Sequence, residues 1–88
     1  MRLDKYLKTA LIFKTRSCGE KNIETGGVLL NGKPAKPASV VKEGDLITVR
    51  TLEKETTYKI VLLLEKNVSR QMAKEMYEVV SETKLDFI

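Results

Sequence analysis

The spacing of the apolar residues changes once along this chain, at the pair Gly26-Gly27. Before the pair these residues recur every three or four positions, and after it they come to alternate, most clearly over residues 58–64. Because a helix repeats every 3.6 residues and a strand every two, the change predicts a helical first half and a second half that begins with strands. With 88 residues the chain has room for one small core, so we expect a single domain over residues 1–88.

The first half predicts two helices. One spans residues 2–11, and its apolar stripe consists of Leu3, Leu7, Ala10 and Leu11. The other begins near Thr15 and runs to about Thr25. Thr15 is a suitable N-cap, but Ser17 together with Glu20 also fits a capping box, and the sequence leaves both starts open.

The second half predicts short strands followed by a helix. The expected segments are a strand over residues 28–30, a tight turn at Asn31-Gly32, a strand over residues 46–52, a loop over residues 53–56 and a strand in which Tyr58, Ile60, Leu62 and Leu64 alternate. A helix over roughly residues 69–82 follows, with the buried stripe Met72, Met76, Val79 and Val80, and then a loose tail over residues 85–88. Together these elements predict an α+β fold, with two N-terminal helices packed on a small, mainly antiparallel sheet, plus a C-terminal helix.

The positive charge of the chain is concentrated at its N-terminal end. The formal net charge is +4, and residues 1–21, with six bases and two acids, already carry that whole excess. Residues 22–50 carry four bases and three acids, and residues 51–88 carry six bases and seven acids. Because an ordinary solvated surface intersperses its charges, this one-sided distribution indicates a polyanionic partner.

The composition argues against several other classes of protein. There is no histidine and only one cysteine, Cys18, which we expect to be a small buried residue and not a reactive thiol. The sequence has neither a metal-ligand cluster nor a glycine-rich phosphate loop, so we expect no enzyme activity, no metal and no cofactor. No stretch approaches the roughly 20 apolar residues of a membrane span, and none resembles a signal peptide. We therefore expect a soluble cytoplasmic protein.

Several cations at the start of the chain could form one nucleic-acid surface. Arg2, Lys5 and Lys8 recur every third residue of the first predicted helix. Lys14 and Arg16 lie at the start of the second helix, where free backbone N–H groups favour a phosphate. Arg16 carries the most weight in this prediction, because a guanidinium can grip a phosphate with two hydrogen bonds.

Further residues could extend or organise this surface. Lys33 and Lys36, near the Asn31-Gly32 turn, could lie at its edge. Asp4 would repel phosphate, so we expect its carboxylate to hold Arg16 or another base in position. Taken alone, lysines along a helix are more often a solvated face. A protein adaptor that docks an acidic partner through the same basic face is the alternative interpretation.

Four segments, in order and with natural spacing, resemble the S4-type RNA-binding domain, also called the alpha-L motif. They are Arg2-Leu3-Asp4-Lys5-Tyr6-Leu7, Lys14-Thr15-Arg16-Ser17, the segment from Gly26 to Lys33, and the segment from Val41 to Val49. The resemblance covers residues 1–50 and implies two helices on a small curved sheet, with RNA across the helical pair. It implies that Arg2, Lys5, Lys14, Arg16 and Ser17 face RNA, with Lys33 at the edge. Residues 51–88, a predicted strand hairpin and helix, match only in general pattern.

In its small size, the chain resembles the stand-alone members of this family that act in bacterial ribosome-associated quality control. That likeness implies binding to rRNA of a stalled large (50S) ribosomal subunit and to its peptidyl-tRNA. It also implies assistance to an RqcH-like partner that adds alanine tails to the blocked nascent chain. We expect a protein that is monomeric when free.

Overall fold

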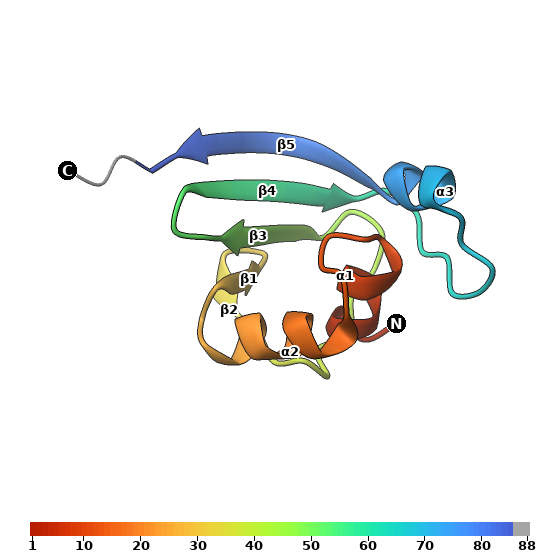
Figure 1. The fold of residues 1–88 in the computed structure, drawn as a ribbon, viewed down its shortest axis with the longest axis horizontal. Helices are drawn as coiled ribbons and strands as arrows, with labels where there is room; N and C mark the ends of the chain where they lie inside the picture. Colours follow the sequence, from red (N-terminus) through yellow and green to blue (C-terminus); the bar gives the residue numbers. More distant parts are fainter. Residues whose placement is uncertain (86–88) are drawn as a thin grey trace.

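The computed structural model describes residues 1–85 as three helices and one five-stranded sheet (Figure 1). The helices are α1 (Leu3–Thr9), α2 (Arg16–Glu24) and α3 (Arg70–Glu75). The strands are β1 (Val28–Leu30), β2 (Lys33–Pro34), β3 (Leu46–Arg50), β4 (Lys54–Ile60) and β5 (Tyr77–Lys84). Their order in the sheet is β2-β1-β3-β4-β5, and every neighbouring pair is antiparallel. The predicted α+β class is confirmed. None of the described helices is long and apolar enough to cross a membrane.

Residue types at its two ends explain the bounds of α2. The Thr15 side chain accepts a hydrogen bond from the Cys18 backbone N–H at 3.1 Å, so Thr15 is the N-cap and the alternative start at Ser17 is not used. At the other end Gly26 has a φ of +86°, and its N–H donates to the Ile23 carbonyl at 3.1 Å. Glycine permits this left-handed conformation at low cost, so the helix ends where the sequence predicts.

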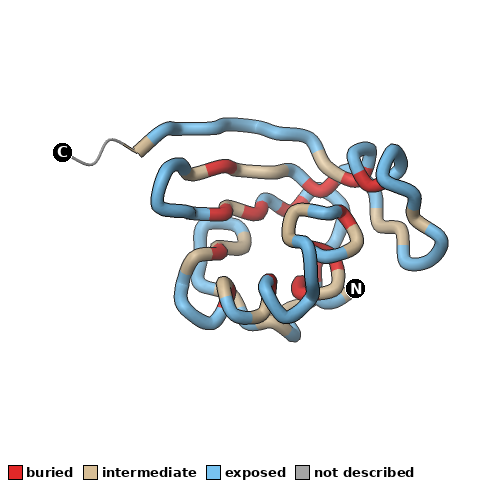
Figure 2. Tube along the Cα trace, viewed as in Figure 1, coloured by how far each residue is buried: buried red, intermediate tan, exposed pale blue. Residues whose placement is uncertain are grey.

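The core lies between the two N-terminal helices and one face of the sheet. Along β3, Ile47 and Val49 are buried while Leu46 and Arg50 are exposed, as expected when alternate side chains point to opposite faces. Figure 2 shows the buried positions gathered along α1 and the middle of the sheet. The fully buried residues that meet there are Leu3, Tyr6, Leu7, Val28, Ile47, Ile60 and Met76. This packing fixes α1 on the sheet.

The first helix is shorter than predicted. It ends at Thr9, and Leu11 has a φ of +58° and is 49% exposed, so its assignment to the apolar stripe is wrong. The backbone N–H groups of Ile12 and Phe13 both donate to the Leu7 carbonyl, which turns the chain out of the helix. This turn lets Ile12 and Phe13 pack against the core in place of Leu11.

The long C-terminal helix predicted over residues 69–82 is wrong in extent. Only Arg70–Glu75 is helical, and Tyr77–Lys84 forms β5, which pairs with β4. Of the predicted buried stripe only Met76 is buried, whereas Met72, Val79 and Val80 are exposed. The apolar spacing fitted a helix by coincidence, and the β-branched content of this segment together with the free edge of β4 favoured a strand.

The strands on either side of the β3–β4 turn also have different bounds from those predicted. The strand expected over residues 46–52 ends at Arg50, and Leu52 is 84% exposed in the turn. The next strand begins at Lys54, inside the predicted loop, and ends at Ile60 before the alternation reaches Leu62. At the tail, the Leu85 N–H donates to the Glu53 carbonyl at 2.8 Å. The remainder of the loose tail predicted over residues 85–88 lies outside the described residues.

Candidate nucleic-acid interface

The centre of the candidate interface is a buried carboxylate between two arginines. Asp4, in the first turn of α1, has no exposed side-chain surface. Its Oδ2 lies 3.1 Å from Arg2 Nη2 and 3.2 Å from Arg16 Nε, and its Oδ1 accepts from Arg16 Nη2 at 3.3 Å. The structure therefore ties the start of α1 to the start of α2 through one carboxylate. We call Arg2, Asp4 and Arg16 the arginine clamp.

Asp4 is held in its charged form. Burial alone would raise the pKa of this carboxyl, but hydrogen bonds from Arg16 and from the Lys5 backbone N–H, together with the charge of Arg16, hold the pKa below its usual value. The Lys5 N–H donates to Oδ1 at 2.8 Å, which is typical for a carboxylate at the N-terminal turn of a helix. Asp4 is thus an anion at neutral pH, and its lone pairs are directed at the two guanidinium groups.

The clamp leaves positive charge at the surface. One carboxylate faces two guanidinium groups, and the Arg2 and Arg16 side chains remain 51% and 45% exposed. Glu20 Oε1, one turn further along α2, lies 3.8 Å from Arg16 Nε and offsets part of this charge at the edge. A guanidinium has five N–H donors in a planar fork, so each arginine can bond Asp4 on one side and still present donors to a phosphate.

The other predicted RNA-binding residues lie on several elements of the fold. Lys5, Lys8, Lys14 and Ser17 belong to α1, to the α1–α2 connection or to the first turn of α2. Lys8, Lys14 and Ser17 are exposed, and no ion pair among residues 1–85 involves either of these two lysines. Lys33 lies on β2, an edge strand of the sheet, and none of the hydrogen bonds and ion pairs of the clamp within residues 1–85 involves it.

Lys5 has an acidic neighbour that the sequence did not predict. Lys5 Nζ lies 3.7 Å from Oε1 of Glu65, in the segment that connects β4 to α3. Sixty positions separate these two residues, so no local spacing could reveal the contact. The structure thus brings a second segment of the chain to the border of the candidate interface.

Tyr6 and Cys18 lie on the two N-terminal helices, and their surroundings decide what each side chain can do. Tyr6 is fully buried, and its hydroxyl donates to the Met76 carbonyl at 2.7 Å, so its ring is not available to stack on a base. A tyrosine hydroxyl is protonated at neutral pH, and burial raises the pKa of Tyr6 further above its ordinary value. Cys18 is exposed in the first turn of α2, and the prediction that it is buried is wrong, because Gly19 and Ile23 form the inner side of this helix.

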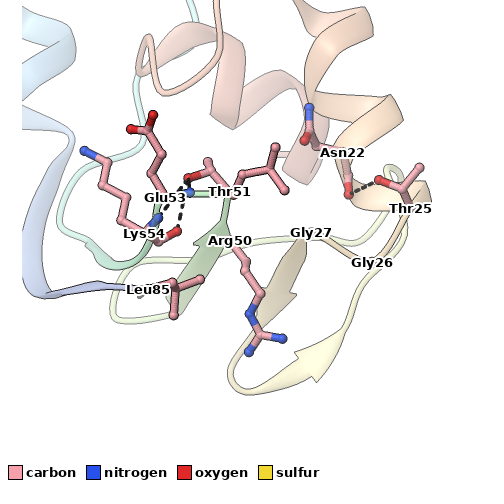
Figure 3. A pocket seen from close by; sticks show the side chains of 10 residues that line it. Asn22, Thr25, Gly26, Gly27, Arg50, Thr51, Glu53, Lys54 and Leu85 are labelled. Carbon is pink, nitrogen blue, oxygen red and sulfur yellow. Dashed lines mark hydrogen bonds between the residues drawn. The ribbon is translucent and has the colours of Figure 1, made fainter. Parts of the chain in front are cut away.

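An open hollow of about 920 Å³ lies at the opposite end of α2 from the clamp (Figure 3). It is lined by the C-terminal residues of α2, the β3–β4 turn and Leu85. Its two cations are already paired within the sheet, Arg50 with Glu55 at 3.0 Å and Lys54 with Glu82 at 2.7 Å. Figure 3 shows the Arg50 and Lys54 side chains pointing in different directions. These cations do not converge on a common point, so the hollow is a poorer anion site than the clamp.

Comparison with known proteins bears directly on this arrangement. The S4 domain matches residues 1–47, which contain the clamp and both N-terminal helices. The chain is 41% identical to the RQC P-site tRNA stabilizing factor of Listeria monocytogenes, over 98% of this chain and 92% of that protein. It is 38% identical to the protein of the same name from Bacillus subtilis, over 97% of this chain and 98% of that protein.

A second group of relatives is named for heat shock. The Escherichia coli heat shock protein 15 is 32% identical over 94% of this chain but only 62% of its own length. A structure of Vibrio cholerae heat shock protein 15, described as trimeric, superposes with a TM-score of 0.83 at 34% identity. That match covers 92% of this chain and 82% of the other. The sequence-based resemblance to an S4-type domain and to its quality-control members is confirmed.

Proposed function

The chain belongs to the S4 domain family, and on that basis we propose that it is a non-catalytic RNA-binding protein of ribosome quality control. In this proposal it binds the large ribosomal subunit and stabilises the tRNA in the P site. The observation that carries the proposal is the arginine clamp, which holds two half-exposed guanidinium groups side by side on packed helices. The near full-length match to two proteins named RQC P-site tRNA stabilizing factor supports the choice of RNA.

The clamp is better suited to binding the phosphate backbone of RNA than to recognising particular bases. Guanidinium groups give bidentate, charge-assisted hydrogen bonds to phosphate, and Asp4 fixes their position before RNA arrives. The lysines that flank the clamp add positive charge, but they are not arranged to recognise the edge of a base. Recognition should therefore follow the shape of folded RNA, and affinity should fall steeply as salt rises.

The partners follow from the same proposal. Large-subunit rRNA and the P-site tRNA are the RNA ligands, and Arg2, Lys5, Lys8, Lys14, Arg16 and Ser17 contact them, with Lys33 at the margin. The chain adds no chemistry of its own, so alanine tailing of the blocked nascent chain belongs to an RqcH-like partner. By keeping the P-site tRNA in place, the chain would hold the blocked nascent chain where that reaction extends it.

Changing Arg16 to Gln tests the proposal, with Arg50→Gln as the matched control. Both arginines are about half exposed and both contact a carboxylate, but Arg50 lies at the far end of the molecule. We expect Arg16→Gln to weaken binding to purified 50S subunits carrying P-site tRNA by about tenfold or more, since a hydrogen bond to a charged group contributes about 1.5–3 kcal/mol. Arg50→Gln should bind like the parent protein.

Two outcomes would contradict the proposal. Equal affinities of the two variants at moderate salt would show that the clamp does not contact RNA. A complex with a cellular partner that survives complete ribonuclease digestion and still depends on Arg16 would favour the protein-adaptor alternative.

A further inference from the structure

A second group of cations lies on the part of the chain that the S4 match does not cover. Lys66, Arg70 and Lys74 follow one another at intervals of four residues, and all three are exposed. None of them takes part in an ion pair among residues 1–85. Arg70 and Lys74 are one turn apart on α3 and so project from the same side of the helix, while Ala73 faces the core.

This second group is fixed to the same end of the molecule as the clamp. The Met76 carbonyl, directly after α3, accepts hydrogen bonds from the Tyr6 hydroxyl at 2.7 Å and from the Val61 N–H at 2.9 Å. Met76 itself is fully buried in the shared core. Figure 1 shows α3 and the preceding loop beside α1, away from the β3–β4 turn. The cations of α3 therefore belong to a packed element and are held near α1.

An exposed carboxylate, Glu65, lies in the segment that connects β4 to α3. Glu65 lies next to Lys66 in sequence, and its Oε1 is 3.7 Å from Lys5 Nζ on α1. This contact offsets the charge of Lys5 and places a 62% exposed carboxylate beside α1 and, in the sequence, next to Lys66. Because a carboxylate repels phosphate, one continuous RNA backbone would avoid this point. Two separate backbone segments, one on each side of Glu65, could both bind without approaching this carboxylate.

We propose that Lys66, Arg70 and Lys74 form a second phosphate-binding surface, the α3 surface, which contacts a different RNA backbone segment from the clamp. The proposal rests on the proposed function, since it assumes that RNA is the ligand of the clamp. It adds that the chain bridges two RNA segments, with Glu65 as the boundary between them. These cations have no ion-pair partner within residues 1–85, and two of them, Arg70 and Lys74, lie on a helix that the core holds near α1. Such cations fit a sugar–phosphate backbone.

The salt dependence of binding provides the test. Each phosphate contact that a cation neutralises contributes about 0.7–0.9 to the slope of log affinity against log salt. Fluorescently labelled protein would be titrated with purified 50S subunits carrying P-site tRNA, over a range of about 50 to 200 mM KCl. The variants are Arg70→Gln with Lys74→Gln, Arg16→Gln, and Lys59→Gln as the control. Lys59 is exposed on the sheet face turned away from the helices.

We expect the α3 double variant to lose roughly 1.4–1.8 from the slope, and Lys59→Gln to leave it unchanged. The swapped pair Arg70→Lys with Lys74→Arg keeps both charges and should restore the slope. Thermal unfolding of each variant checks that the fold is intact. A double variant whose slope equals that of Lys59→Gln, while Arg16→Gln still weakens binding, would overturn the α3 surface and leave the proposed function standing. An unaffected Arg16→Gln would instead overturn the proposed function.

Discussion

Asp4 is the residue on which the candidate interface depends. It is the only carboxylate among residues 1–85 that is fully buried, and it contacts both arginines of the clamp. Burying a charge is costly unless partners compensate for it, and here two guanidinium groups and the Lys5 N–H do so. The same contacts that stabilise this end of the fold also aim Arg2 and Arg16 outward. A single residue thus links folding to the proposed function.

Asp4→Asn should reveal both roles. The amide keeps the size of the side chain but removes the charge, so we expect a loss of about 1–3 kcal/mol in the free energy of unfolding at pH 7, as well as weaker RNA binding. The pKa of Asp4 is lowered in the folded state, so its contribution is present above the ordinary pKa of about 4 and is lost as pH falls through the folded value.

Urea unfolding of the parent protein and of Asp4→Asn, from pH 7 down to pH 3, measures this contribution. The stability difference between the two proteins should shrink as the pH falls below about 4. A difference that stayed constant over this range would show that Asp4 does not stabilise the fold through its charge.

At the scale of elements, one glycine within α2 and one after it have opposite requirements. Gly19 faces the core, and a Cβ there would meet Leu7 and Phe13 side-chain atoms at 3.7–3.8 Å, an ordinary contact distance. Gly27 follows the helix, and a Cβ there would lie 3.3 Å from the carbonyl oxygens of Arg50 and Asn22. Gly19 therefore has room for a methyl group, whereas at Gly27 the backbone carbonyl oxygens leave too little room for one.

The two alanine variants should therefore change stability in opposite directions. Gly19→Ala should raise the free energy of unfolding by about 0.5–1 kcal/mol, because alanine loses less backbone entropy in a helix. Gly27→Ala should lower it, since the backbone around α2 and β3 must move. Guanidinium unfolding of both variants checks the signs. Destabilisation by Gly19→Ala would mean that α2 packs more tightly on α1 than these distances allow.

At the scale of the whole molecule, the two ends of the long axis differ in their cations. The described residues extend over 43 × 23 × 22 Å. The clamp and the α3 cations lie towards one end, and the hollow beside the β3–β4 turn, with its paired cations, lies towards the other (Figures 1 and 3). The S4-matched residues supply the clamp, and the remainder of the chain supplies α3. The Tyr6–Met76 hydrogen bond joins these two parts across 70 positions of sequence.

Tyr6→Phe removes that hydrogen bond and leaves the aromatic ring in the core. The Met76 carbonyl keeps its bonds from Val61 and Leu62, so we expect a modest loss of about 0.5–1.5 kcal/mol in stability. Amide hydrogen exchange should accelerate more over residues 61–76 than in α2, because the bond fixes α3 to α1. Uniform acceleration across both regions would argue against a specific role in docking α3.

Local patterns in the sequence determined most of the first half of this protein, apart from the end of α1 and the exposure of Leu11 and Cys18. The apolar stripe of α1, the Thr15 cap, the glycine after α2 and the Asn31-Gly32 turn each depend on residues within a few positions of one another. Such interactions can be read from spacing and side-chain chemistry. The charge of residues 1–21 could be predicted in the same way, and so could the expectation that Asp4 contacts a base.

Only the tertiary structure decided the second half and the borders of the interface. Residues 77–84 have apolar spacing that fits a helix, but pairing with β4 made them a strand, and the hydrogen bonds of a sheet come from residues far away in sequence. The Lys5–Glu65 contact, the exposure of Cys18 and the place of the α3 cations beside α1 depend in the same way on how distant segments pack. Spacing along a chain carries no information about such contacts, because they exist only once the core has formed.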